Sequence, residues 1–323
     1  MRNTIMSIYN DSSFDEYESL LIDLSDAIRL QDNHRADEIR RRMEGPERKL
    51  TNDMMERLDG LAADLYMLSD SELFERADPY EAVPGHIVVE LRSAWESEDW
   101  TSVLTILRKR MPFLSAEHRA YLRAVAYDKL GQPGSAFRFM DYASHINPAD
   151  QTYQYFALAY LNQSGNAESA AFRAGQQLDD PKSAPTVIIG AAATLVQTSR
   201  NLPRSDFVSR ASRVIPFVTD ILNNEASLSG TPREVIALAY VTLGFCLAGL
   251  GDFDKAGAAY KVALEVDPGN GPAQVALGTL VEDQEYTNSV NLEYMVPTTA
   301  TNANLLNVKF ELEKANQIWA EAV

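Results

Sequence analysis

Few residues in this sequence have the types and spacing that chemistry at a protein site requires. The four histidines (His34, His86, His118 and His145) lie far apart, and none has the H-x-x-x-H or H-E-x-x-H spacing of metal ligands. The single cysteine, Cys246, follows Phe245 in an apolar segment, where a buried and inert thiol is expected. No phosphate-binding loop and no G-x-S-x-G turn is present. We therefore expect no catalytic residue, metal or cofactor, and a protein that is not an enzyme.

The net charge argues against two classes of partner. The chain has 29 Lys and Arg against 46 Asp and Glu, a net charge of −17, so it lacks the positive footprint that nucleic acid or an anionic membrane requires. Residues 1–80 carry 19 acidic and 10 basic residues, which indicates a separate acidic module. No segment approaches the ~18 apolar residues of a membrane span. We expect a cytoplasmic protein that binds neither nucleic acid nor membrane.

Hydrophobic residues recur at helical spacing along most of the chain. Met54, Leu58, Leu61 and Leu65 form one face of a helix that Thr51 can cap. Strand signals are weak throughout. In residues 1–80 the other expected helices are 14–30 and 35–43, the second of which Gly45-Pro46 ends. Beyond this module we expect paired helices at 86–97 with 100–110, 117–130 with 133–146, 151–163 with 166–178, 186–200 with 205–222 and 232–250 with 253–266, then single helices at 271–281 and 303–322.

The segment 237–270 has residue types whose spacing predicts a tight helical hairpin. Gly244 and Ala256 are small at positions where the two helices would cross closely. Tyr260 and Ala263 would pack against the next hairpin. Pro268 would end the second helix, because proline has no N–H to donate and disfavours helix at the preceding residue.

With Tyr240 and Leu243, these residues resemble the tetratricopeptide repeat at nearly every signature position, although Leu247 replaces the usual Tyr. The same register fits 117–150, where Arg123 stands in place of the family's Leu. The unit 151–184 is a weaker match. Residues 185–236 must hold a longer, irregular hairpin, in which Pro216 should kink the second helix. The matching positions are Ala124, Tyr127, Gly131, Ala136, Ala143 and Pro148 in the first unit, and Leu161, Gly165 and Ala170 in the second.

The resemblance implies an all-α fold, a right-handed solenoid of helical hairpins. We expect an acidic helical module at 1–80, a repeat array at 81–282 and, at 283–323, a linker with a C-terminal capping helix. That last helix could instead dock on a partner or on a second copy of the chain. Its apolar stripe is Leu305, Val308, Leu312, Ala315 and Trp319.

In this family the first helices of the hairpins line a groove that accepts a peptide or a helix. The groove positions here are apolar and aromatic, without the Lys and Asn pattern by which chaperone-binding members hold a terminal carboxylate. This implies a partner helix or an apolar peptide. The alternative is that these side chains are core, packed against neighbouring hairpins or the last helix. The positions are His118, Tyr121, Val125, Asp128, Thr152, Tyr155, Ala159, Asn162, Leu238, Val241, Phe245 and Ala248.

The function that follows is a scaffold or adaptor that binds another protein. Two alternatives remain open at the level of sequence: a regulator in which a peptide in the groove repositions the acidic N-terminal helices, and a secretion-type chaperone. Self-association through the C-terminal helix is also possible.

Overall fold

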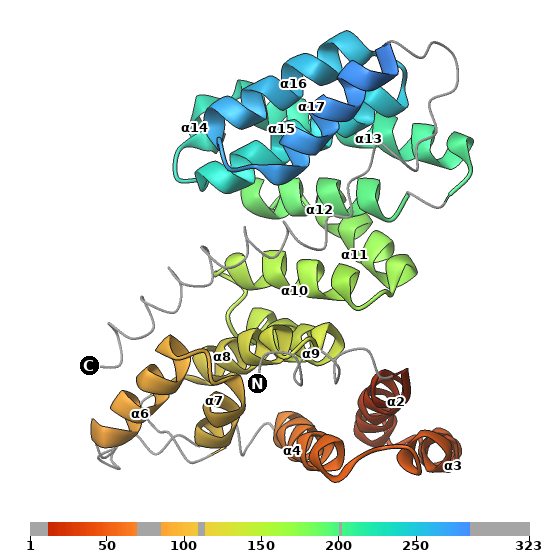
Figure 1. Ribbon diagram of the computed structural model, residues 1–323, viewed down its shortest axis with the longest axis vertical. Helices are drawn as coiled ribbons and strands as arrows, with labels where there is room; N and C mark the ends of the chain where they lie inside the picture. The colour runs from red at the N-terminus through yellow and green to blue at the C-terminus, as the bar shows by residue number, and fades with distance from the viewer. Residues whose placement is uncertain (1–11, 70–84, 109–113, 200–201, 285–323) are drawn as a thin grey trace. The chain divides into compact units, whose positions relative to one another are not determined.

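The computed structural model describes residues 12–69, 85–108, 114–199 and 202–284. Within these residues the regular structure is helical and contains no strand, which confirms the predicted all-α, helical-repeat fold (Figure 1). The chain forms two compact units, whose described parts are residues 12–147 and 148–284. The predicted helix at 303–322 lies outside the described residues.

The first unit contains the acidic N-terminal helices and the first hairpins. Helix α2 contacts both α3 and α4, and α9 is contacted by both α2 and α4. The helices are α2 (Ser12–Arg29), α3 (Asn33–Glu47), α4 (Asn52–Ser69), α6 (Gly85–Glu96), α7 (Trp100–Leu107), α8 (Ala116–Lys129) and α9 (Pro133–Ile146).

The second unit contains the remaining hairpins, which share one continuous hydrophobic core that runs from α10 to α17. Every helical pair expected from the sequence is present, with ends that differ by a few residues. The helices are α10 (Thr152–Gln163), α11 (Ala167–Asp179), α12 (Pro185–Gln197), α13 (Arg204–Asn223), α14 (Glu225–Leu228), α15 (Arg233–Gly249), α16 (Phe253–Val266) and α17 (Gly271–Gln284).

Three hairpins turn in the same way. Gly131, Gly165 and Gly251 each follow the first helix of a pair and have φ of 75°, 80° and 89°. This left-handed conformation is open to glycine at little cost, so the helix ends there and the chain reverses. The next residue then caps the second helix in two of the hairpins, where Asn166 and Asp252 accept hydrogen bonds from backbone amides.

The hairpin of α15 and α16 is held together by a close approach at Gly244. A Cβ atom at this position would lie 2.3 Å from Cε1 of Tyr260, so only glycine allows the ring to lie there. Ala256 of α16 is fully buried. The predicted close crossing is therefore present. The sequence pattern did not predict that Tyr260 lies over Gly244 of its own hairpin.

The N-terminal helices have small cores of their own. One cluster joins α2 to α3 around Leu20 and Ile39, and another joins α2 to α4 around Phe14 and Leu58. The amide of Met54 donates to Oγ1 of Thr51 at 3.3 Å, as expected for a cap. Helix α3 continues through Pro46 and ends one residue later, so the prediction that Gly45-Pro46 ends it was slightly early. Proline has no N–H to donate, so the last turn of α3 lacks one helical hydrogen bond at Pro46.

Candidate functional site

A cleft opens in the second unit along the first helices of three hairpins. Helix α12 contacts both α10 and α15 and therefore forms the middle of the cleft, and the start of α17 adds Pro272 to its wall. The cleft has a volume of about 80 Å³, below the ~300–1,000 Å³ of small-molecule sites, so it is a shallow indentation in the surface of these helices. It is lined by Tyr155, Ala159, Asn162, Gln163, Gly190, Ala193, Thr194, Val196, Gln197, Leu238, Val241, Thr242, Phe245 and Pro272.

The charges of this unit are segregated away from the cleft. Helices α10 and α12 contain no charged residue, and α15 has only Arg233 and Glu234, both in its first turn. The second helices of the same hairpins, α11, α13 and α16, each carry several Asp, Glu, Lys or Arg residues. None of the described residues that line the cleft is charged. A charged ligand would therefore be desolvated there without a partner of opposite charge.

Aromatic rings form part of the cleft wall. The ring of Tyr155 lies against Gly190 of α12 and packs edge-to-face on Phe156, with 5.5 Å between ring centroids. Phe245 of α15 packs in the same manner on Tyr260, at 5.6 Å. Burial raises the pKa of the Tyr155 hydroxyl to about 12, so it stays neutral at physiological pH. These rings give the cleft a rigid apolar surface.

Neutral amides supply most of the polarity of the cleft. Nδ2 of Asn162 donates to Oε1 of Gln197 at 2.5 Å, which joins α10 to α12 across the cleft. Nε2 of the neighbouring Gln163 is buried without a hydrogen-bond partner. The hydroxyl of Thr242 donates to the backbone oxygen of Leu238 at 2.8 Å. The cleft can thus offer amide hydrogen bonds to a peptide, but no ion pair.

The hairpin of α15 and α16 is similar to a known repeat family. Residues 237–270, most of α15 and all of α16, match the family model of the tetratricopeptide repeat. This segment is a tetratricopeptide repeat. The crystal structure of the P58(IPK) tetratricopeptide repeat domain is similar over 95% of this chain and 80% of that chain, at 14% sequence identity and a TM-score of 0.27. No curated protein matches the sequence.

The structure brings six of the predicted groove residues together. The cleft of the second unit is lined by Tyr155, Ala159, Asn162, Leu238, Val241 and Phe245. Thr152 and Ala248 are absent from its lining. The other predicted positions, His118, Tyr121, Val125 and Asp128, belong to α8 in the first unit, where Tyr121 and Val125 are fully buried.

Sequence reasoning missed the contribution of α12. Gly190, Ala193, Thr194 and Gln197 form the middle of the cleft, but the hairpin at 185–236 has no repeat signature from which a register could be assigned. One signal was available. The absence of charge from α12, between two charge-free stretches of neighbouring first helices, is typical of a buried or ligand-facing helix.

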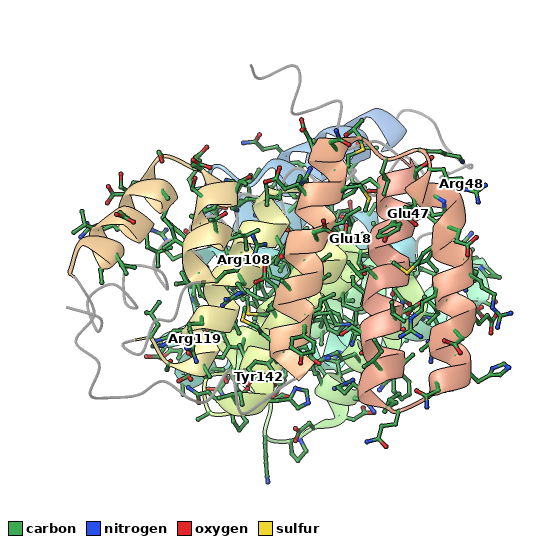
Figure 2. The ribbon with its side chains drawn as sticks, turned by 90° about the horizontal axis from the view of Figure 1, so that it is seen from below. Glu18, Glu47, Arg48, Arg108, Arg119 and Tyr142 are labelled. Atoms are coloured by element: carbon green, nitrogen blue, oxygen red, sulfur yellow. The ribbon has the colours of Figure 1, made fainter. Side chains whose placement is uncertain are left out.

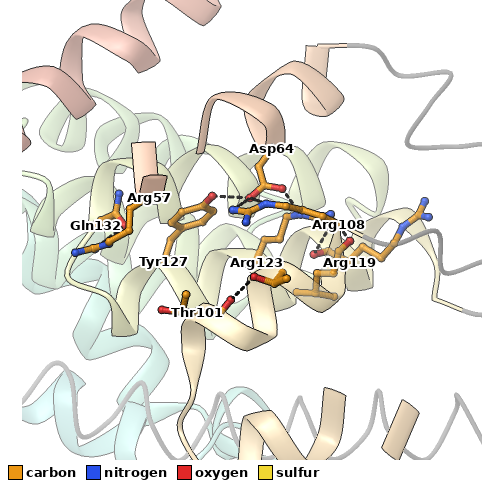
Figure 3. A network of polar contacts seen from close by, with 10 residues as sticks. Arg57, Asp64, Thr101, Arg108, Arg119, Arg123, Tyr127 and Gln132 are labelled. Atoms are coloured by element: carbon orange, nitrogen blue, oxygen red, sulfur yellow. Dashed lines mark hydrogen bonds and ion pairs between the residues drawn. The ribbon is translucent and has the colours of Figure 1, made fainter. Parts of the chain in front are cut away.

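The first unit contains a buried polar network where the repeat pattern has Leu (Figure 3). Asp64 of α4 is fully buried and binds Arg108 Nη2 at 2.9 Å, Arg123 Nε at 3.3 Å and the hydroxyl of Tyr127 at 2.6 Å. Burial, and then the Asp64 charge, hold the pKa of Tyr127 well above its usual value. Arg123 also donates to the backbone oxygen of Leu107. The departure of Arg123 from the family pattern is therefore explained by its contact with the N-terminal helices.

Further polar contacts join the same N-terminal helices to the α8–α9 hairpin. Ser135 donates to Glu18 at 2.5 Å, and Arg57 donates to Gln132 at 3.0 Å. Figure 2 shows Glu18 and Arg108 among the helices of this unit, whereas the exposed Glu47 and Arg48 lie at its edge. Burial raises the pKa of the Glu18 carboxyl, although its hydrogen bonds oppose the shift. These contacts position helices, and none of them converges on an open site.

No group of three or more His, Cys, Asp or Glu among the described residues could hold a metal ion. None of the described helices combines the length and the apolar character needed to cross a bilayer. Cys246 is buried in α15, and burial raises the pKa of its thiol to about 12.

Proposed function

We propose that this protein is a scaffold or adaptor that binds an apolar helix or peptide of another protein in the cleft formed by α10, α12 and α15. One observation carries the proposal. The three helices that line the cleft are free of charge along it, whereas the second helices of the same hairpins carry the charges of the unit. Tetratricopeptide repeats are in general modules of protein–protein interaction, which supports the assignment.

The composition of the cleft limits what it can bind. A partner that places two or three Leu or Phe side chains in it gains about 2 kcal/mol from each. Much of this gain is offset by the loss of translational and side-chain freedom on association. The amides of Asn162, Gln163 and Gln197 can satisfy polar groups of a peptide. We therefore expect apolar anchors and neutral flanks in the ligand, rather than a terminal carboxylate.

The peptide-sensing alternative is favoured by a different observation. The N-terminal helices α2 and α4 contact the α8–α9 hairpin through polar groups such as Glu18 with Ser135 and Asp64 with Arg123. Their hydrophobic clusters lie among α2, α3 and α4 themselves. Release of this module would expose the buried side chains of these contacts to solvent. A peptide that binds this protein as a regulator should therefore change the accessibility of Arg123 or Glu18.

A peptide-display selection against the full chain tests the proposed ligand. Selected peptides should carry Leu, Phe or Trp at helical spacing, and their affinity is measured by fluorescence anisotropy. Ala159→Lys places a charge on the cleft wall and should weaken binding at least about tenfold, because the ammonium would be desolvated. The matched control is Ala226→Lys on the exposed helix α14, which should leave affinity unchanged. Equal binding by both variants would contradict the proposal.

A further inference from the structure

We propose that the N-terminal helices supply a helix cap that the α8–α9 hairpin lacks. Glu18 of α2 takes the place of a local N-cap side chain at the start of α9, so α9 loses its cap when α2 leaves it. This contact couples the docking of the N-terminal helices to the order of the α8–α9 hairpin. The inference goes beyond the proposed function, because it concerns the first unit and not the cleft.

Among the described residues, five hairpins share one turn, and four of them cap their second helix locally. They are α2–α3, α6–α7, α8–α9, α10–α11 and α15–α16. In each turn a residue with positive φ precedes the N-cap residue of the second helix. In four hairpins the N-cap side chain accepts a hydrogen bond from the backbone amide three positions on, at 3.0–3.4 Å. The capping residues are Asp32, Asp99, Asn166 and Asp252.

The α8–α9 hairpin is the exception among these five. Its N-cap residue is Gln132, whose side chain makes no capping hydrogen bond. The backbone of Gln132 has φ −113° and ψ 64°, similar to the −83° and 69° of the capping residue Asn166. A glutamine side chain is one methylene longer than the asparagine side chain that is preferred at this position. The turn therefore has the backbone of a local cap without the side chain that would complete it.

Glu18 supplies the missing acceptor from α2. Its carboxylate accepts from the hydroxyl of Ser135, the residue three positions after Gln132, at 2.5 Å, and both Glu18 and Ser135 are buried. Burial raises the pKa of this carboxyl, whereas hydrogen bonds from the side chain and the backbone of Ser135 oppose the rise. A Cβ atom at Gly134 would lie 3.3 Å from Cδ1 of Ile22, so α2 lies directly against the first turn of α9.

The other helix end at this turn is bound by α4. Arg57 donates to the backbone oxygen of Leu130, at the C-terminus of α8, at 3.4 Å and to Oε1 of Gln132 at 3.0 Å. A cation at a helix C-terminus and an anion at a helix N-terminus both complement the helix dipoles. One turn further along α9, Arg138 pairs with Asp26 of α2. The N-terminal helices thus hold both ends of the turn, and a partner that draws α2 away uncaps α9.

Hydrogen exchange in the full chain, followed by mass spectrometry, tests whether Glu18 acts as a cap. Glu18→Ala should speed exchange at the start of α9, residues 133–138, about fivefold, the effect of a lost N-cap. Glu18→Gln keeps an oxygen acceptor and should change this exchange much less. The matched control is Asp252→Ala, which removes the local cap of α16. It should speed exchange at residues 253–258 and leave 133–138 unchanged.

A local cap should make α9 independent of Glu18. Gln132→Asn places a preferred cap residue in the existing turn and should restore native exchange in the Glu18→Ala protein. Gln132→Ala loses the same contact with Arg57 but cannot cap, so it should restore nothing. If Glu18→Ala alone does not fold, the same two changes decide the question. Recovery of folded protein with Gln132→Asn, and not with Gln132→Ala, supports the cap.

Four results overturn the inference. Unchanged exchange at residues 133–138 in Glu18→Ala means that α9 needs no cap from α2. Faster exchange that Gln132→Asn does not reverse assigns the effect to lost packing between α2 and α9. Equal rescue by Gln132→Asn and Gln132→Ala means that position 132 does not act through capping. Failure of both double variants to fold means that Glu18 holds the unit together in some way other than as a cap.

Discussion

Nε of Arg123 lies 3.3 Å from Oδ1 of Asp64, and both side chains are buried although the residues are 59 positions apart in the sequence. The repeat pattern has Leu at position 123. The ion pair therefore takes the place of an apolar contact within the repeat, and it joins α8 to the N-terminal helix α4.

Arg123→Leu restores the family residue but should destabilise the first unit by about 3 kcal/mol, because Asp64 loses one of its buried partners. Arg108 and Tyr127 remain bonded to Asp64, which places the effect at the lower end of the range for a broken buried pair. Urea unfolding is followed by tryptophan fluorescence in a Trp319→Phe background, so that Trp95 and Trp100 of this unit supply the signal.

The matched control for this substitution is Arg213→Leu. Arg213 pairs with Asp179 at 2.7 Å on an exposed surface, so its loss should cost under about 1 kcal/mol. A cost at Arg123 no larger than the cost at Arg213 would show that the buried network adds nothing to stability. Combining Arg123→Leu with Asp64→Leu should cost less than the sum of the two single changes, because both changes remove the same ion pair.

Gly244→Ala should destabilise the second unit by about 1–3 kcal/mol, because the added Cβ would overlap the ring of Tyr260. Gly257→Ala on α16 is the control. No atom lies within 4 Å of the position of its Cβ, so this change should stabilise the helix by about 0.5–1 kcal/mol. Thermal unfolding measured by circular dichroism compares the two. Equal melting temperatures would mean that the close crossing does not contribute.

Glu18→Gln should stabilise the protein near neutral pH. Burial raises the pKa of Glu18 in the folded state above 4.5, its usual value, so the folded state holds the proton more tightly than the unfolded state. Stability from this group is then present at low pH and is lost as pH rises through the folded-state pKa. The amide can still accept from Ser135 without carrying a buried charge.

The measurement for Glu18 is the free energy of unfolding of both proteins at about pH 4 and about pH 7. At the higher pH the variant should have the larger free energy of unfolding, and this difference between the two proteins should shrink at the lower pH. An advantage that is the same at both values would assign the effect to packing rather than to proton binding.

Cys246 should resist a thiol reagent such as dithionitrobenzoate in the native protein and react fully in denaturant. Its thiol is buried in α15, so the reagent cannot reach it. Its pKa is raised to about 12, so little of the reactive thiolate is present at neutral pH. Labelling against urea concentration then reports the unfolding of the second unit. Rapid labelling without denaturant would show that α15 opens locally.

Local chemistry determined most of the secondary structure. The glycines that end first helices, the capping residue Thr51 and the small residues Gly244 and Ala256 each act within a few residues or within one hairpin. Such interactions can be inferred from spacing, which is why the hairpin at 237–270 was predicted in detail. The predicted groove residues of α10 and α15 followed from the same register.

Only the tertiary structure decided which surfaces those helices present. Gly190 and Gln197 of α12 line the cleft because α12 lies between α10 and α15, a contact between segments that share no repeat signature. Tyr121 and Val125 occupy groove positions in the register, yet both are fully buried. Arg123 departs from the repeat pattern, and its contact with Asp64 in the folded protein explains the departure. Periodicity along the chain specifies which face of a helix is apolar, but the neighbour that covers that face depends on packing between distant segments.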